Sequence, residues 1–401
     1  MNQNYVCSKS FPNPNELDEF KKENTGKTIE ELRLKFGRSS NFQVHIDQLE
    51  IRQKMSQRFP KLINRKDYIF PKASLLSQAS SEATARWRST YMSTIQPLTN
   101  ILEANGGSGI DTWGLERAGA KNIDICEINE SLCEVMYHNS IGSASNRNIF
   151  NIDVENFKAQ KIYDWTYADP SRIDPDGKRV FHPKKYSPNP LDLVKKWEDW
   201  ASYVAIKLSP MLDPNQVLRW FTNCKYLITL SVQKEVKELI MISSKAKAIR
   251  PKRFAVDINN EGIENYRILI HTGIKYSSTD EPNAFVYDPD PVIVASNGVP
   301  LVSKKWNLKT LHISSRILTS PDYHSDFPGR IFKVIRKEKP YSSDWPLGAS
   351  VISRNFPENN DEIRRRLKCK ENKEHFLFAY EDTSGNKWFL RCQRIFANNK
   401  K

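Results

Sequence analysis

The 401-residue sequence lacks any apolar run that approaches the roughly 20 residues needed to cross a bilayer. Its first residues also lack the charged and then apolar layout of a secretory signal. We therefore expect no membrane partner and a cytoplasmic protein. The sequence contains no internal repeat and no low-complexity segment.

Cysteine is scarce, and no two of the six cysteines form a C-x-x-C pair. Zinc ribbons and dithiol redox motifs both need such pairs, so neither has support, and we predict no metal. We expect free, mostly buried thiols in a reducing compartment.

Charge is unevenly distributed along the chain. Hydrophobic residues make up 39% and aromatic residues 11%, which favours a globular protein of two or three domains. Residues 301–401 contain 21 Lys+Arg and 11 Asp+Glu, and so carry +10 of the net +14. A basic domain beside a nearly balanced one indicates a polyanionic partner, and a solubilising surface charge is the alternative.

The clearest pattern in the sequence lies between residues 101 and 129. An apolar run at 101–104 is followed by a glycine-rich turn at 105–111, a helix-like stretch at 112–118, and a second apolar run that leads to Glu127. Strand, glycine loop, helix, strand and carboxylate together are typical of a nucleotide-binding unit. Glycines allow close backbone approach to a ligand, and a carboxylate in this place can accept hydrogen bonds from ribose hydroxyls.

One glycine of the dinucleotide-binding fingerprint is missing. After Gly107 and Gly109, the third glycine of G-x-G-x-x-G would stand at position 112, which is Thr112. Pyrophosphate binding needs that close helix–strand approach, so NAD and FAD are disfavoured. Asp111 suits a cationic ligand better than a diphosphate. A tight turn in an unrelated α/β protein is the alternative.

Three regions follow from the periodicity of the sequence. Residues 1–98 are predicted to be mainly helical, with Ser81 as a helix cap. Residues 99–272 alternate between strands and helices, which predicts a parallel sheet, although 233–242 fits a helix or a strand. Residues 273–401 are basic and strand-rich. The expected helices are 16–36, 44–59, 81–95, 130–138, 191–200, 214–221 and 363–367, and the expected later strands are 148–152, 163–168, 203–208, 226–232, 330–336, 376–380 and 388–394.

Four consecutive strand ends carry polar groups. They are the glycine loop, Glu127, Asp153, and the run Asp169-Pro170-Ser171-Arg172. Ligands of open α/β sheets bind beyond the carboxyl ends of the strands. This order resembles class I S-adenosyl-methionine-dependent methyltransferases. From about Tyr68 onward, the chain resembles a family of such enzymes with a C-terminal THUMP-like domain. The stretches that carry this resemblance are QASSEATARW, GGSGIDT, YADPSRID with GKRVF, EVKEL, EPNA, and NFP followed by RRRLK and FLFAY.

The resemblance implies a fold, a cofactor and a partner. The expected α/β fold is a Rossmann-like class I methyltransferase sheet with an N-terminal helical cap and a C-terminal α+β THUMP-like domain. S-adenosyl-methionine would be the cofactor and RNA, either tRNA or rRNA, the acceptor. By the resemblance, Glu127 would hold the ribose and Asp153 the adenine amino group. The expected cofactor-binding residues are Glu103, Asn105, Gly106, Gly107, Gly109, Asp111, Glu127, Ile128, Asp153, Val154 and Asp169.

Asp169, Pro170, Ser171 and Arg172 would face the acceptor as the catalytic run. Methyltransferases acting on exocyclic amines have an aromatic residue here for a flipped base to stack on, and this chain has Ser171 and Arg172 instead. The nature of the acceptor atom is therefore open.

Two basic groups are candidate substrate-binding residues. The insertion 173–189 offers cations interleaved with Phe181 and Tyr186, which suits single-stranded nucleic acid, and a solvated loop is equally compatible. An arginine run near the C-terminus is the second group, although it can instead pair with Asp361, Glu362 or Glu371. The candidates are Lys178, Arg179, Lys184, Lys185, Arg364, Arg365 and Arg366.

Two other functions fit the sequence. One is a non-catalytic RNA-binding protein with a methyltransferase-like fold, and the other is a methyltransferase for a small-molecule or protein substrate. The oligomeric state is open.

Overall fold

A computed structural model of the chain describes residues 11–37, 40–174, 176–246, 250–275, 277–343, 345 and 348–396. The expected free thiol Cys7 and Pro175 of the insertion lie outside these ranges. The chain forms two compact units. The first comprises Met1–Gln233, Lys237–Lys252 and Val256–Arg267, and the second Lys234–Val236, Arg253–Ala255 and Ile268–Lys401.

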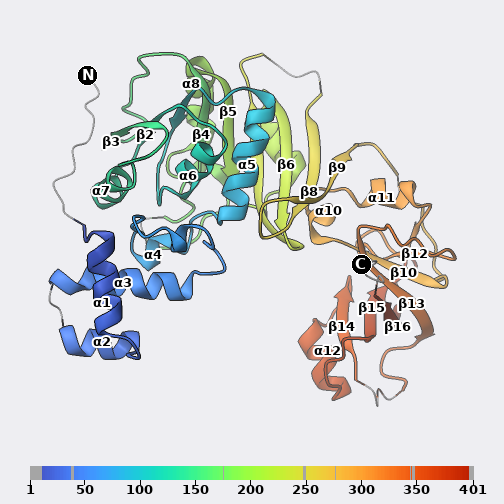
Figure 1. The fold of residues 1–401 in the computed structure, drawn as a ribbon. Coiled ribbons are helices and arrows are strands. Elements are labelled where there is room, and N and C mark those ends of the chain that lie inside the picture. Colours follow the sequence, from blue (N-terminus) through green and yellow to red (C-terminus); the bar gives the residue numbers. More distant parts are fainter. Residues whose placement is uncertain are drawn as a thin grey trace. The chain divides into compact units, whose positions relative to one another are not determined.

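A sheet with strand order β3-β2-β1-β4-β5-β7-β6-β8-β9 organises the first unit (Figure 1). The first five strands are parallel, and β7 is antiparallel to β5. The segment 233–242, which periodicity left open, is therefore a strand. The bounds are β1 (Asn100–Glu103), β2 (Asn122–Cys126), β3 (Asn146–Phe150), β4 (Tyr163–Ala168), β5 (Ala201–Leu208), β6 (Cys224–Val232), β7 (Glu235–Ser243), β8 (Lys252–Ile258) and β9 (Glu264–Ile270).

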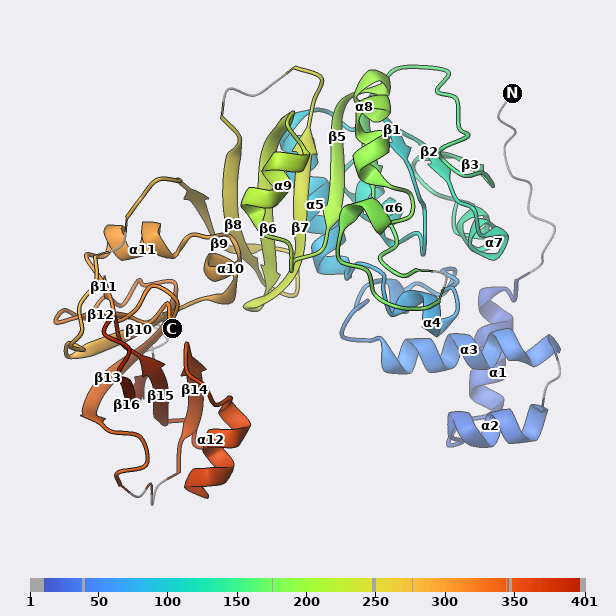
Figure 2. The same cartoon turned by 180° about the vertical axis from the view of Figure 1, so that it is seen from behind.

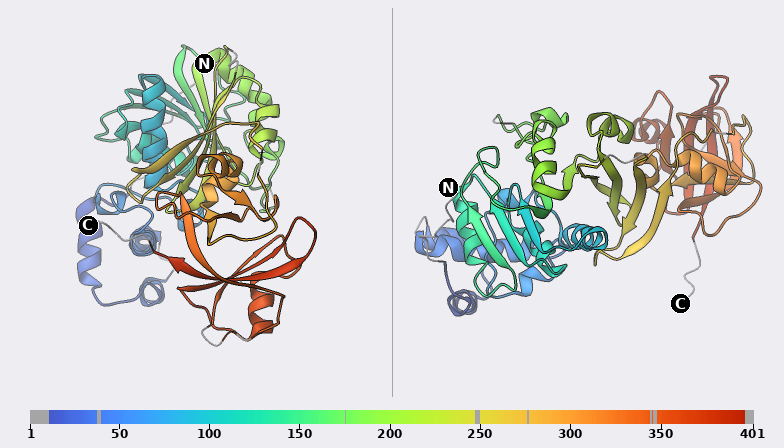
Figure 3. Two further views of the ribbon diagram at one scale, coloured as in Figure 1. Left: turned by 90° about the vertical axis from the view of Figure 1, so that its right-hand side faces the viewer. Right: turned by 90° about the horizontal axis from the view of Figure 1, so that it is seen from above.

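Helices cover both faces of this sheet, as expected for a Rossmann-like arrangement. α5 (Glu82–Ile95), α6 (Ile110–Arg117) and α7 (Glu130–His138) lie on one face, and α8 (Pro190–Trp200) and α9 (Pro214–Trp220) lie on the other (Figures 1 and 2). The right-hand view of Figure 3 shows the two sets on opposite sides of the sheet. Because both faces are covered, the central strands are apolar and buried.

The N-terminal helices differ in part from the prediction. The expected single helix 16–36 is divided into α1 (Pro14–Glu23) and α2 (Ile29–Phe36). Gly26 adopts φ +85° between them, and Thr28 starts α2 with a capping box. α3 (Ser40–Lys54) and the short α4 (Ala73–Leu76) follow. Ser81 caps α5 as predicted, with its Oγ accepting from the Thr84 amide at 3.2 Å.

The second unit is an α+β domain around a sheet of order β11-β12-β10-β13-β16-β15-β14. β14 and β15 are parallel, and the other neighbouring strands of this sheet are antiparallel. The three strands predicted between 330 and 394 lie within β13, β15 and β16. The bounds are β10 (Phe285–Pro289), α10 (Pro291–Ala295), α11 (Val299–Lys305), β11 (Lys309–Thr310), β12 (Leu318–Ser320), β13 (Gly329–Glu338), β14 (Ser350–Arg354), α12 (Asn360–Leu367), β15 (His375–Glu381) and β16 (Lys387–Ile395).

The five cysteines inside the described ranges are buried, and none of them forms a disulfide. Among the helices described here, none combines the length and the apolar character that a membrane crossing requires.

Candidate functional site

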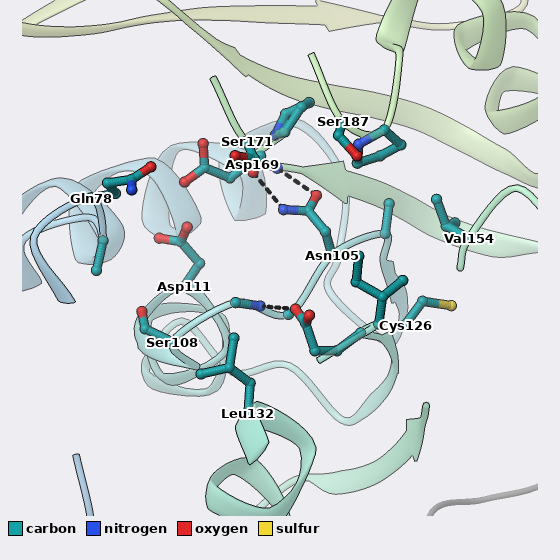
Figure 4. Close-up of a pocket in the computed structure, with 18 of the residues that line it drawn as sticks. Gln78, Asn105, Ser108, Asp111, Cys126, Leu132, Val154, Asp169, Ser171 and Ser187 are labelled. Carbon is teal, nitrogen blue, oxygen red and sulfur yellow. Dashed lines mark hydrogen bonds between the residues drawn. The ribbon is translucent and has the colours of Figure 1, made fainter. Parts of the chain in front are cut away.

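A cavity of about 270 Å³ opens at the carboxyl ends of β1, β2 and β4 (Figure 4). It brings together polar groups from strand ends that are distant in the sequence. Of the predicted site residues, those that line it are Asn105, Gly106, Gly107, Asp111, Glu127, Ile128, Asp153, Val154, Asp169, Pro170, Ser171 and Arg172.

Glu103 and Gly109 are not part of the lining. Glu103 is completely buried, and one of its oxygens accepts from the Thr112 hydroxyl at 2.6 Å. Burial raises the pKa of Glu103 well above its usual range. Thr112, which replaces the third fingerprint glycine, thus supplies a polar partner inside the sheet–helix contact. Gly109 precedes α6 with φ +76° and serves the turn rather than the cavity wall.

The amides of the glycine loop are occupied within the protein. Gly106 N donates to Cys126 O at 2.9 Å, Gly107 N to a Glu127 carboxylate oxygen at 2.7 Å, and Gly109 N to Gly106 O at 3.1 Å. A Cβ on Gly106 would lie 2.5 Å from the Ile125 side chain, so the loop can approach β2 only with glycine there. These three amides are not available to a diphosphate, which agrees with the missing fingerprint glycine.

Glu127 joins the loop to the end of β2. Its second oxygen accepts from Asn129 N at 2.8 Å, so both oxygens hold backbone amides. Burial raises the pKa of Glu127, although the bonds from Asn129 and Gly107 oppose the shift. Each carboxylate oxygen has two lone pairs, so each can accept a further hydrogen bond from a ligand hydroxyl.

The far part of the cavity combines one exposed carboxylate with apolar groups. Asp153 lies three residues beyond β3, because the strand ends at Phe150 rather than at the predicted Ile152. One of its oxygens accepts from Glu155 N at 2.9 Å. Val154 is buried, whereas the Ile128 side chain is 66% exposed. The arrangement offers apolar surface and a hydrogen-bond acceptor together, as a heterocyclic ring with an amino group requires.

Asn105 links the segment 169–172 to the glycine loop. Asp169 N donates to Asn105 Oδ1 at 3.0 Å, and Asn105 Nδ2 donates back to Asp169 O (Figure 4). The Asp169 carboxylate accepts from Lys207 Nζ at 2.7 Å. Lys207 is buried and also donates to Ser80 Oγ at 3.0 Å.

Sequence reasoning missed Lys207 and Arg88. Lys207 interrupts an apolar strand, which is an available signal, since lysine is rarely buried without a partner. Arg88 is buried in α5 and forms ion pairs with Asp111 and, at 2.6 Å, with Glu238. Burial opposes ionisation of Asp111, but the charges of Arg88 and Lys207 outweigh it and hold the pKa of this carboxyl below its usual range.

The environment of Asp111 changes its predicted role. Its carboxylate also accepts from the Tyr167 hydroxyl at 2.9 Å, so its charge is largely compensated by internal partners. The structure therefore gives less support than expected to a role of Asp111 as the direct counter-charge of a cationic ligand. The better-supported role is to connect α5 to the cavity wall through Arg88.

The end of the insertion 173–189 is hydrogen-bonded to the segment 169–172, but the basic side chains of the insertion do not line the cavity. Ser171 N donates to Ser187 O at 2.8 Å, and the reciprocal bond is 3.1 Å long. Tyr186 is buried, so the expectation that it offers a stacking face is wrong, whereas Phe181 is 58% exposed. The four basic candidates of this segment are exposed and lie outside the cavity lining, namely Lys178, Arg179, Lys184 and Lys185.

The arginine run of α12 is engaged by nearby groups. Arg364 pairs with Glu371 and, at 2.7 Å, with Asp361. Arg366 pairs with Glu358 at 3.2 Å and lies 3.9 Å from the centre of the Tyr341 ring. Arg365 Nε donates to the Asp361 carbonyl at 3.3 Å. Arg364 and Arg366 are therefore paired on the surface, as the alternative expected, whereas Arg365 has a carbonyl rather than a carboxylate as its partner.

No three His, Cys, Asp or Glu side chains within the described ranges are grouped so that they could hold a metal ion.

The chain is similar to known proteins in two ways: a family model matches part of its second unit, and a solved structure matches almost its whole length. Residues 339–394 match the family model for the THUMP domain-like family. No curated protein matches the sequence. A crystal structure of a provisionally named methyltransferase from Porphyromonas gingivalis W83 is similar to the chain, with a TM-score of 0.81, 22% identity, and coverage of 95% of this chain and 98% of that one.

Two further solved structures have lower scores. A protein from Pyrococcus horikoshii that is provisionally named an RNA methyltransferase has a TM-score of 0.34 and 17% identity, over 51% of this chain and 98% of that one. A tRNA (m1A58) methyltransferase from Aquifex aeolicus has a TM-score of 0.30 and 14% identity, over 43% and 71%.

Proposed function

We propose that this chain, in which a class I methyltransferase fold is joined to a THUMP-like domain, is an S-adenosyl-methionine-dependent methyltransferase that acts on RNA. One observation carries the proposal: the ends of β1, β2 and β4 bring Asn105, Glu127 and Asp169 to a single cavity of about 270 Å³. Convergence of polar groups beyond the carboxyl ends of parallel strands is where such sheets bind their ligands.

The residues of the cavity fit S-adenosyl-methionine better than a dinucleotide. Glu127 would accept from the ribose hydroxyls, and Asp153 from the adenine amino group beside Ile128 and Val154. Three of the loop amides that a pyrophosphate could use, those of Gly106, Gly107 and Gly109, already donate to groups of the protein. When bound, the cofactor supplies a methyl group that is already activated, so the protein has mainly to position the acceptor.

Asp169 is the residue proposed to orient the acceptor. The Asp169 side chain is 21% exposed, and the pairing of its carboxylate with Lys207 fixes its orientation. An ionised carboxylate held in this way can accept a hydrogen bond from an acceptor N–H and so align the nitrogen. In place of an aromatic ring the chain presents Arg172, whose planar guanidinium can stack on a base or bind phosphate.

RNA is proposed as the acceptor on two grounds. THUMP-like sequence covers 339–394, and residues 301–401 carry 21 Lys+Arg against 11 Asp+Glu. Positive charge concentrated in one domain is suited to a polyanion.

Calorimetry with S-adenosyl-methionine tests the cofactor assignment. Glu127→Ala should weaken binding at least tenfold, because each charge-assisted hydrogen bond to the ribose contributes on the order of 1.5–3 kcal/mol. Glu130→Ala, an exposed change on α7, is the matched control and should bind as the wild type does. Equal affinity in Glu127→Ala and Glu130→Ala would rule the assignment out.

A further inference from the structure

The second unit contains a basic groove that lies apart from the arginine run of α12. It has a volume of about 410 Å³. Four cations and two aromatic rings that line it are Arg330, Arg354, Lys373, Arg394, Phe376 and Phe396.

The strand register places these side chains on one face of the sheet. β13, β16, β15 and β14 are consecutive neighbours in the sheet (Figure 2). Phe332 pairs with Arg394, Phe376 with Cys392, and Ser350 with Phe376. Since side chains on a strand alternate between faces, Arg330, Arg394, Phe376 and Arg354 all project from the same face. The groove therefore crosses four strands, which at roughly 4.8 Å per strand is a width of about 14 Å.

The positive charge of the groove is only partly compensated. Asp288 accepts from Arg330 at 2.5 Å and lies 3.6 Å from Arg354. Within the part of the chain that the structure describes, neither Lys373 nor Arg394 has a carboxylate partner. By contrast, Arg364 and Arg366 of α12 are both paired. Among the described residues, the groove thus has two cations without a carboxylate partner, Lys373 and Arg394, whereas α12 has one, Arg365, whose Nε donates to the Asp361 carbonyl.

An aromatic ring stands beside this charge. Phe396 is 53% exposed, and the Arg394 guanidinium lies 4.8 Å from its ring centre. Phe376 is only 5% exposed and forms part of the floor. An exposed ring next to cations provides a surface for a base as well as for a phosphate.

We propose that this groove binds a single-stranded segment of RNA, with Lys373, Arg394, Arg330 and Arg354 at the phosphates and Phe396 against an unpaired base. The ring distinguishes this ligand from a phosphopeptide, which would use the cations alone, and from duplex RNA, whose bases are not free to stack. This inference rests on the proposed function only in one respect, namely that the bound RNA is the methyl acceptor.

Fluorescence anisotropy tests the groove with the full-length protein and a short, labelled, single-stranded RNA of mixed sequence. Two double variants remove the same charge: Lys373→Ala with Arg394→Ala in the groove, and Arg364→Ala with Arg366→Ala on α12. Between about 50 and 300 mM salt, the groove variant should lower the log–log salt slope by roughly 1.4, since each lost phosphate contact contributes about 0.7. The α12 variant should keep the wild-type slope.

Phe396→Ala should weaken binding roughly tenfold at every salt concentration without a change of slope, and Phe396→Tyr should restore it. Equal slopes for the two double variants would overturn the groove assignment, and equal binding of the corresponding duplex would overturn the single-strand assignment. Lys373 is exposed, so Lys373→Ala alone repeats the test without risk to the fold. Calorimetry with S-adenosyl-methionine on the same proteins separates the two proposals: absent cofactor binding refutes the methyltransferase and leaves the groove standing.

Discussion

Glu127 connects the protonation of a single side chain to the proposed cofactor affinity. Burial raises its pKa above the ordinary 4.5, and only the ionised form can accept from two hydroxyls while it holds Gly107 N and Asn129 N. Affinity for S-adenosyl-methionine should therefore be full at neutral pH and fall as the pH is lowered, with the fall centred above pH 4.5. Calorimetry from about pH 5 to pH 8 measures this.

Glu127→Gln is the variant that isolates the titration, because its amide does not ionise in this range. It should bind more weakly than the wild type, since an amide N–H would face a backbone donor, and its affinity should not vary with pH. If the affinity of Glu127→Gln fell with decreasing pH in the same way as that of the wild type, the titrating group would be a residue other than Glu127.

Asp169 and Lys207 form the second prediction at this scale. Asp169→Asn should lower methyl transfer to RNA about a hundredfold or more, in the range of a positioned proton-handling group, with cofactor affinity nearly unchanged. Lys207 would retain Ser80 and, at 3.9 Å, Glu238, so the fold should survive. Lys207→Arg preserves the charge pair and should retain most activity. A collapsed melting temperature in Asp169→Asn would make the aspartate structural instead.

Glu127 and Asp169 could be predicted to lie at the cavity because each directly follows an apolar strand. Lys207 and Arg88 could not, because their partners are tertiary. Lys207 is 38 positions from Asp169 and 127 from Ser80, and Arg88 is 150 from Glu238. Periodicity predicts which elements form, but it does not report which distant charges a fold brings into contact.

At the scale of elements, Gly114 sets the closeness of α5 and α6. A Cβ there would lie 2.8 Å from Ala85 O and 2.9 Å from Ala85 C, which are backbone atoms that cannot rotate away. Gly114→Ala should destabilise the protein by about 1–3 kcal/mol through overpacking, although alanine favours the helix by about 1 kcal/mol. Urea denaturation measures the change.

Arg117→Ala is exposed on the same helix and should shift stability by less than about 0.5 kcal/mol. Because α5 carries Arg88, the Gly114 variant should also weaken cofactor binding. A Gly114→Ala protein as stable as Arg117→Ala would show that the two helices can separate at little cost.

Element boundaries show where local patterns reach their limit. The expected helix 16–36 has a continuous apolar spacing, and only the backbone of Gly26 and the capping box at Thr28 divide it. Most of the ambiguous segment 233–242 lies in β7 (Glu235–Ser243), which has buried apolar residues and pairs between β5 and β6. This position depends on the whole sheet and cannot be predicted from the local sequence.

For the molecule as a whole, the alternation of strands and helices predicted a parallel sheet, and the change of composition after about residue 273 predicted a basic, strand-rich region. The class I methyltransferase sheet and the α+β THUMP-like domain were implied by the resemblance of the motifs to a known family. The excess of positive charge in residues 301–401 could also be counted from the sequence, but which of these cations lack a carboxylate partner could not be predicted. The sequence emphasises the arginine run of α12, whereas the structure pairs Arg364 and Arg366 and leaves Lys373 and Arg394 without a carboxylate partner among the described residues.

Nucleoside mass spectrometry tests the central proposal most directly. Purified protein is incubated with methyl-deuterated S-adenosyl-methionine and with total RNA from cells that lack the protein, and the digested nucleosides are examined for the label. We predict a labelled methylnucleoside with the wild type and none with Asp169→Asn. Two results would contradict the account: RNA that stays unlabelled although the wild-type protein binds the cofactor, or equal labelling of the RNA by the wild type and by Asp169→Asn.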